Sequence, residues 1–148
     1  MINVVDNNCT SIARIGIIFL QSNEIIMKLN YKIPKYLKDA YNKELGLYEV
    51  ALANSDFTNA WYHLERSHII GQSYPIEHTY SHWLMLKFGL MQKNTKEVFG
   101  QIIRLIVGGW KSFINHIPIG NTGGANVPPL KRMPIPNDIK NLFNQKPF

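Results

Sequence analysis

Side chains that could do chemistry gather at residues 63–83, which read HLERSHIIGQSYPIEHTYSHW and hold four of the five histidines. Glu65 and His68 are three residues apart, and His78 and His82 are four apart, so each pair shares one face if its segment is helical. Imidazole and carboxylate ligands suit zinc, iron, nickel and copper, and helical bundles hold such metals between inward-facing pairs of this kind. The stretch is therefore either a metal site or a helical hairpin with hydrogen-bonded interior histidines.

The apolar pattern predicts which histidines face the interior. At about 100° per residue, His68 falls in the middle of its apolar stripe, Glu65 lies about 60° to one side, and His63 lies about 140° from His68 on the other. His78 and His82 share a face that continues through apolar residues. The two stripes consist of Phe57, Ala60, Trp61 and Leu64, and of Met85, Leu86 and Gly89.

A tight hairpin about residue 73 would set positions level whose numbers sum to about 146, which pairs His68 with His78. His82 then lies opposite Leu64 and beside His63. The predicted metal ligands are therefore His68, His78 and His82, with Glu65 or His63 completing the shell. The alternative is a buried hydrogen-bond network, since each buried polar group needs a partner; the available partners are Tyr41, Tyr80, Glu44 and Glu77.

Arg104 is the strongest argument against the metal site. It interrupts an apolar segment near the level of His82, and a buried arginine normally needs a carboxylate. Glu65 or Glu77 could supply one, and if Glu65 does, the metal loses a ligand. A structural polar network of Glu77, Gln101 and Arg104 is accordingly the competing prediction.

The elements that must position these side chains are four helices with short connections. The first begins at Pro34, and the second follows a cap at Ser55 or Asp56 and stops at Gly71. The third runs from Pro75 to about Gln92. The fourth follows a capping box of Asn94 and Glu97 and ends before Pro118. The apolar faces of the first and fourth are Leu37, Tyr41, Leu45, Tyr48 and Leu52, and Val98, Ile102, Leu105, Ile106, Gly109 and Phe113. No segment alternates like a half-buried strand. The prediction is an all-α fold, either an antiparallel four-helix bundle or two stacked helical hairpins.

The tail from Pro118 begins PIGNTGGANVPP, which has no apolar period and must be a loop. A phosphate-binding loop needs a preceding strand and a Gly-Lys-Ser/Thr ending, and both are missing. We therefore expect Asn121, Thr122, Gly123 and Gly124 to form turns packed against the helices, and no nucleotide cofactor. Ile135, Ile139 and Leu142 predict a short last helix docked on the body. His116 is expected to be structural or exposed.

Composition narrows the function classes. The formal net charge is +6, but the densest basic run, at Lys28, Lys32, Lys35 and Lys38, lacks an aromatic platform, which disfavours nucleic-acid binding. The only cysteine, Cys9, favours a reducing cytoplasm, and no apolar run reaches the roughly 20 residues of a membrane span.

The length of 148 residues suits one helical domain, expected over residues 31–148. Residues 1–30 are expected to be a disordered or non-native extension, since Met27 opens a sequence of different character. Natural translation from Met27 is a hypothesis, which native peptides from upstream of it would refute.

Several stretches together resemble the small bacterial family catalogued as domain of unknown function 3703. They are HLERSHIIGQ, EH with HW, EVFGQIIRL, PIGNTGGANV and a final PIP, and the likeness spans about Pro34 to Leu142. The motifs include Glu97, Gln101, Arg104 and Asn121. The resemblance implies no established activity and favours a link to heavy-metal or cation efflux.

A weaker likeness connects residues 56–67 with one helix of a tetratricopeptide repeat, in which small residues let helices pack closely. The leading hypothesis is a helical protein that binds, buffers or senses a transition metal. The alternatives are a tetratricopeptide-like protein-interaction scaffold with a buried His/Arg/Glu network, and a metal-dependent hydrolase or transferase with Glu65 as base. No activated nucleophile is evident, so binding is favoured over catalysis; the metal and the oligomeric state stay open.

Overall fold

The computed structural model describes residues 32–111 and 119–145, and side chains as far as residue 106 in the first range. These ranges contain helices and no strand, which confirms the all-α prediction. The helices are α2 (Lys35–Ala53), α3 (Phe57–Gly71), α4 (Pro75–Met91), α5 (Thr95–Lys111) and α6 (Asn137–Phe143). Several predictions fall on residues outside the described ranges: those about Cys9, Met27, Phe113, His116 and the extension at residues 1–30. The predicted inward position of Gly109 on α5 also lies beyond the described side chains.

Local signals place the helix ends where the sequence predicted them. Pro34 is the residue before α2, and the Asp56 carboxylate accepts a hydrogen bond from the backbone N–H of Asn59 at the start of α3. Pro75 opens α4, and the Asn94 side chain accepts from the backbone N–H of Glu97 at 3.1 Å. The Asp56 and Asn94 side chains each accept from a backbone N–H that has no acceptor within the first helical turn. Pro75 stands at a position where a backbone N–H would have no such acceptor either.

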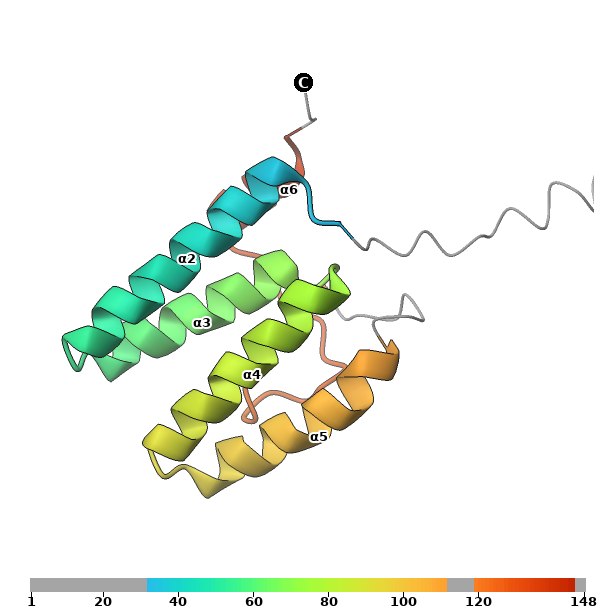
Figure 1. The fold of residues 1–148 in the computed structure, drawn as a ribbon. Helices are drawn as coiled ribbons and strands as arrows, with labels where there is room; N and C mark the ends of the chain where they lie inside the picture. Colours follow the sequence, from blue (N-terminus) through green and yellow to red (C-terminus); the bar gives the residue numbers. More distant parts are fainter. Residues whose placement is uncertain (1–31, 112–118, 146–148) are drawn as a thin grey trace, which may run out of the picture.

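The four long helices follow one another in space as two antiparallel hairpins. Helix α2 packs on α3, α3 on α4, and α4 on α5, and Figure 1 shows the α4–α5 pair beside the α2–α3 pair. This order favours two stacked hairpins over a closed four-helix bundle. Helices α3 and α4, which carry the histidines, are therefore in the middle of the stack.

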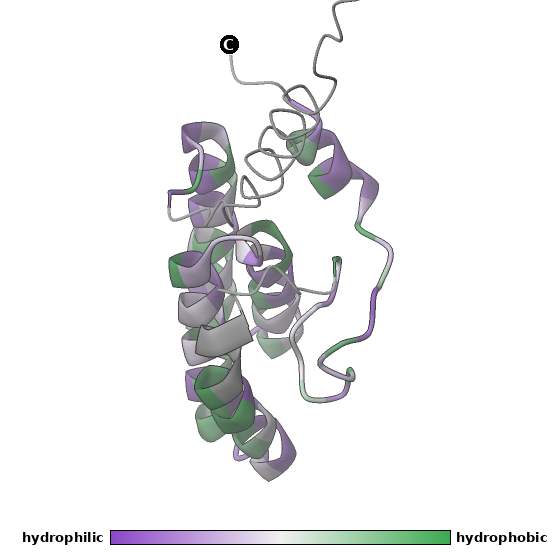
Figure 2. Cartoon of the chain, turned by 90° about the vertical axis from the view of Figure 1, so that its right-hand side faces the viewer, coloured by the Kyte–Doolittle hydropathy of each residue, from purple (hydrophilic) through white to green (hydrophobic). Residues whose placement is uncertain are grey.

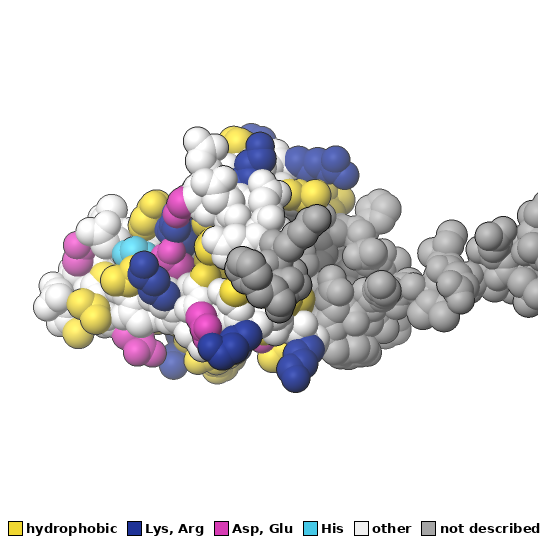
Figure 3. All heavy atoms as spheres, turned by 90° about the horizontal axis from the view of Figure 1, so that it is seen from above, with side chains coloured by type: hydrophobic (Ala, Val, Ile, Leu, Met, Phe, Trp, Pro, Cys, Tyr) yellow, Lys and Arg dark blue, Asp and Glu magenta, His cyan; other side chains and the backbone are white. Residues whose placement is uncertain are grey.

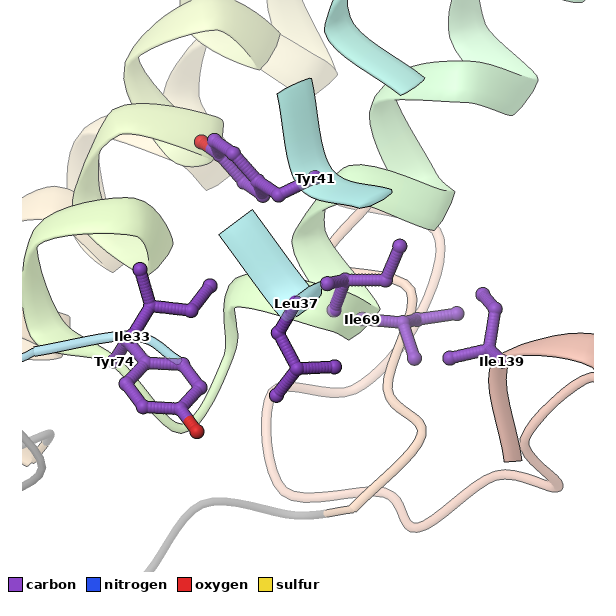
Figure 4. Close-up of a cluster of buried hydrophobic side chains, with 7 residues drawn as sticks. Ile33, Leu37, Tyr41, Ile69, Tyr74 and Ile139 are labelled. Carbon is purple, nitrogen blue, oxygen red and sulfur yellow. The ribbon is translucent and has the colours of Figure 1, made fainter. Parts of the chain in front are cut away.

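The apolar core consists of two clusters along the stack. One joins α2, the end of α3 and α6 through Leu37, Tyr41, Ile69 and Ile139 among others, and Figure 4 shows Ile139 reaching in beside Ile69. The other joins the remaining halves of α2, α3 and α4 through Tyr48, Ala60, Leu64, Met85 and Phe88. The predicted docking of the last helix is confirmed, because Ile139 is fully buried.

The segment after residue 118 runs with α6 along one side of the long helices (Figure 2). It is a loop, as predicted, with glycines at positive φ at Gly120 (+79°) and Gly123 (+85°). This backbone region suits residues without a Cβ. Its course brings residues 121–127 against α3 and α5.

The buried face of helix α5 differs from the predicted one. Ile102 and Ile106 are 41% and 69% exposed, whereas Glu97 and Gln101 are buried. The prediction for these two isoleucines was wrong, because the side of α5 that meets α4 and the loop is the polar one. None of the helices in the described part is long and apolar enough to cross a membrane.

Candidate metal centre

Three histidines from the middle of the stack meet in the interior. His68 lies in the last turn of α3, His78 in the first turn of α4 and His82 one turn later. The connection between the two helices is only three residues long, and Gly71 permits their close approach: a Cβ there would lie 2.9 Å from the Cβ of Glu77. The three imidazole centroids consequently form a near-equilateral triangle with sides of 4.6–4.7 Å.

The rings turn their Nε2 atoms toward one another. Nε2 of His82 lies 3.2 Å from Nε2 of His68 and 3.1 Å from Nε2 of His78. All three residues are buried, with exposed fractions of 3%, 8% and 4% for His68, His78 and His82. Among the described residues, these three form the group of His, Cys, Asp and Glu side chains that could hold a metal ion.

Hydrogen bonds fix the tautomer of two of the rings. Nδ1 of His68 lies 3.0 Å from the carbonyl oxygen of Asn121, and Nδ1 of His82 lies 2.7 Å from Oε1 of Gln101. Both oxygens can only accept, so both Nδ1 atoms carry the hydrogen. In the neutral ring each Nε2 is then left with a lone pair, which is the atom that binds metal.

The Gln101 amide owes its orientation to acceptors on its other side. Its Nε2 donates to Oε1 of Glu97 at 2.6 Å and to the carbonyl oxygen of Gly123 at 2.9 Å. The Glu97 carboxylate also accepts from the backbone N–H of Ala125, at 3.1 and 3.0 Å to its two oxygens. With Nε2 held by these acceptors, Oε1 must face His82. Such partners of ligating histidines fix the ring and raise its basicity.

The environment keeps the imidazoles neutral. Burial lowers the pKa of His78 to about 4, and burial together with the neighbouring His78 lowers the pKa of His82 to about 3. Burial and the two other histidines lower the pKa of His68 well below its usual value. At neutral pH the Nε2 lone pairs of His68 and His82 therefore face each other and repel. A cation between the two nitrogens would be attracted by both.

The spacing of the nitrogens matches a metal coordination shell. With metal–nitrogen bonds of about 2.0–2.1 Å, neighbouring ligands are separated by about 3.3 Å around a tetrahedral ion and by about 2.9 Å around an octahedral one. The two Nε2 separations of 3.1 and 3.2 Å lie between these values. The rings could thus accept an ion with little movement.

The predicted loop residues form the wall over the site. Asn121 organises the loop, because its Nδ2 donates to the carbonyl oxygens of Pro128 and Lys131 and its Oδ1 accepts from the N–H of Gly123. Gly123 lies flat against the His68 ring, where a Cβ would come within 2.8–2.9 Å of three ring atoms. The loop thereby closes the site on the side of α3.

Glu65 and His63 are not brought into the triad. Nδ1 of His63 lies 2.8 Å from Oε2 of Glu44, which Arg66 also contacts through Nε at 2.8 Å. Glu65 lies beside Trp61 and Thr122, and burial raises the pKa of its carboxyl group. Both residues lie on the shoulders of the α3 stripe, and each turns toward a partner other than the three Nε2 atoms.

The contacts of Glu77, Gln101 and Arg104 differ from those expected of the predicted polar network. Arg104 bonds to backbone carbonyl oxygens, through Nη2 to Gly124 and Val127 at 2.9 and 2.6 Å and through Nη1 to Gly100 at 3.3 Å. Arg104 does not pair with Glu65. The main argument against a metal site, that the buried arginine would need this carboxylate, therefore does not hold. Glu77 pairs instead with Lys38 at 3.1 Å. Of the predicted network, Gln101 is the member that touches the triad.

The role of Glu97 was missed by the sequence analysis, which treated it as half of a capping box. A signal was nevertheless present, because Glu97, Gln101 and Arg104 recur at four- and three-residue spacing and form a polar stripe on α5. A polar stripe facing a Gly-rich loop indicates side chains that hold the loop backbone.

Comparison with known proteins shows a match to a family model. The family model described as Protein of unknown function (DUF3703) matches residues 35–143, which span all five described helices. No curated protein and no solved structure matches the chain.

Proposed function

Because the chain belongs to the DUF3703 family, whose description states no activity, we propose from the site itself that the protein binds a transition-metal ion through Nε2 of His68, His78 and His82. The matched region includes all three histidines and the loop over them. The proposal gives the protein a role in binding, buffering or sensing the metal rather than in catalysis.

One observation carries this proposal: two buried imidazoles have their Nδ1 hydrogens committed and their Nε2 lone pairs aimed at each other, 3.2 Å apart. A hydrogen-bond network needs donors opposite acceptors, and this pair offers two acceptors. The buried-network alternative explains the Nδ1 contacts of these rings but not the approach of their Nε2 atoms.

The donor set indicates the class of metal. Three imidazoles suit zinc, nickel, copper and iron, whereas calcium and magnesium prefer oxygen ligands. Glu65 was the candidate base for a hydrolase, and the carboxylate turns to Trp61 and Thr122. This arrangement favours holding an ion over activating a water.

The test is metal analysis of the full chain, stripped with a chelator and reloaded separately with zinc, nickel, copper and iron. We expect one ion per chain for at least one of these metals, and a rise in melting temperature on loading, because an ion that binds only the folded state stabilises it. His78→Ala and His82→Ala should each lose the ion.

His63→Ala is the matched control, because His63 is on the same hairpin but contacts Glu44 instead of the triad. It should retain full stoichiometry. An unchanged melting temperature with all four metals, or equal binding by His82→Ala and the parent chain, would refute the proposal.

A protein-interaction scaffold is the second candidate function, favoured by apolar side chains on the outer faces of α4 and α5. Ile76, Trp83, Phe99 and Ile106 are 65%, 50%, 67% and 69% exposed, and large exposed apolar side chains are the material of interaction sites. The scaffold predicts that Phe99→Ser abolishes association with a partner and leaves metal content unchanged. In the view of Figure 3, basic side chains are interspersed with acidic and apolar ones, so the described side chains of that face form no single-sign stripe for nucleic acid.

A further inference from the structure

The three proposed ligands have no charge to offset that of a metal ion. All are imidazoles, which bind a metal as neutral rings, and within the described part of the chain the group includes no carboxylate or thiolate. A divalent ion in the triad would therefore keep its full charge in a buried place, where an uncompensated charge is costly.

Arg104 adds a second positive charge nearby. Its guanidinium is bonded to carbonyl oxygens, and it makes no ion pair with any described residue. Arg104 lies near the triad, because its Nη2 donates to the carbonyl oxygen of Gly124, next to the Gly123 that lies against the His68 ring. Even with the carboxylates of Glu97 and Glu65 ionised, a divalent ion and Arg104 leave an excess of positive charge around the triad.

The triad also leaves the coordination shell incomplete. A zinc-like ion takes four ligands, and sites with three protein ligands bind water or another exogenous molecule in the fourth position. Glu65 and His63, the residues expected to complete the shell, turn to other partners. Within the described part of the chain no fourth side chain joins the three histidines, which leaves the fourth position to a ligand from solution.

We propose that the metal held by His68, His78 and His82 binds a small inorganic anion directly, as its fourth ligand. This inference rests on the proposed metal-binding function. An anion supplies the missing ligand and offsets the excess positive charge in one step. It must be small, because the three rings are at most 8% exposed and the Gly123 backbone lies against His68.

The test uses the full chain loaded with cobalt(II), whose visible absorption reports the ligands around the ion, and azide as the anion. We expect a saturable spectral change at one azide per cobalt. His63→Ala should behave like the parent chain, and His82→Ala, which loses the cobalt, should show no change. Arg104→Gln should keep the cobalt and bind azide several-fold more weakly, whereas Arg104→Lys should bind it as the parent chain does.

The outcomes distinguish the two proposals. Cobalt bound through the triad, with a spectrum that does not respond to saturating azide, would overturn the anion site and leave the metal site standing. No binding of cobalt, and none of zinc, nickel, copper or iron, would overturn both. Azide affinity unchanged in Arg104→Gln would overturn the part assigned to the arginine charge.

Discussion

At the scale of single residues, the site depends on which nitrogen of each imidazole is occupied. His68 and His82 each donate Nδ1–H to an oxygen, of Asn121 and Gln101 respectively. These oxygens belong to groups that are themselves held, by the loop hydrogen bonds of Asn121 and by the contacts of Gln101 with Glu97 and Gly123. The chemistry of the triad is therefore set by residues that would never touch the metal.

Replacing Gln101 tests this dependence. Gln101→Ala removes the acceptor for His82 and a partner of the Glu97 carboxylate, so we expect metal affinity to fall about 10- to 100-fold. Competition with a chromophoric chelator measures the affinity. The exposed Gln92, replaced by alanine, serves as control; equal loss in both variants would show that the Gln101 contact is irrelevant.

The lowered pKa values predict how the metal-free protein responds to acid. The unfolded histidines take up protons near pH 6.5, whereas folded His78 and His82 do so at about 4 and 3. The unfolded state thus binds more protons between these values, so stability is full above about pH 6.5 and falls as the pH drops toward 4. Each such histidine contributes a slope of about 1.4 kcal/mol per pH unit.

Urea unfolding with a chelator present, at steps between pH 7 and 4, measures this slope. Acidic residues also titrate in the lower part of the range, so the comparison is with His78→Gln, which should lose about one histidine's share of the slope. Parallel pH profiles for the two proteins would contradict the prediction.

At the scale of elements, the loop after α5 acts as a fourth wall for a site built on three helices. It is attached mainly through polar contacts: Glu97 and Gln101 bind the backbone of Ala125 and Gly123, and Arg104 binds Gly124 and Val127. These bonds explain why the buried face of α5 is polar and why its isoleucines lie outside. The loop and the triad are consequently coupled through His68 and His82.

Gly123→Ala tests this coupling. The new methyl group would lie within 2.9 Å of the His68 ring, at a φ of +85°, so the loop must shift. We expect stability to fall by about 1–3 kcal/mol and metal affinity to fall with it. Thermal unfolding and metal competition measure the two effects.

Gly46→Ala is the control for this substitution, because nothing lies within 4 Å of its added methyl group and Gly46 is exposed within α2. It should raise stability by about 0.5–1 kcal/mol, the usual difference between glycine and alanine inside a helix. If the Gly123→Ala protein were as stable as the Gly46→Ala protein, the loop would not pack against the His68 ring.

At the scale of the whole molecule, the C-terminal segment ties the ends of the described chain together. Ile139 of α6 is fully buried against α2 and α3, and Arg66 of α3 contacts both Glu44 of α2 and Asp138 of α6. The loop over the metal centre therefore runs between two anchors, α5 at one end and α6 at the other. Docking of α6 helps to hold that loop in place.

Ile139→Ala should reduce the free energy of unfolding by about 2–4 kcal/mol, because it leaves a cavity in the core. Urea denaturation measures the loss. Leu130→Ala, at a position 60% exposed, should change stability little. If the two variants were equally stable, α6 would not be part of the folded core.

The sequence by itself determined the helices, their ends, and the inward direction of His68, His78 and His82. These features depend on caps and on repeats of three and four residues, which act within one or two helical turns. The family match and the docked last helix were predicted in the same way, from motifs and apolar spacing.

Only the tertiary structure decided which polar side chains serve the triad. The carbonyl oxygen that orients His68 comes from Asn121, 53 residues away, and Glu97 meets Ala125 across 28 residues. A residue on the shoulder of a helical stripe, such as Glu65 or His63, can turn to either side, so the nearest partner decides its role. The isoleucines of α5 lie outside for a similar reason: the loop needs hydrogen bonds, which only the polar side of that helix can provide.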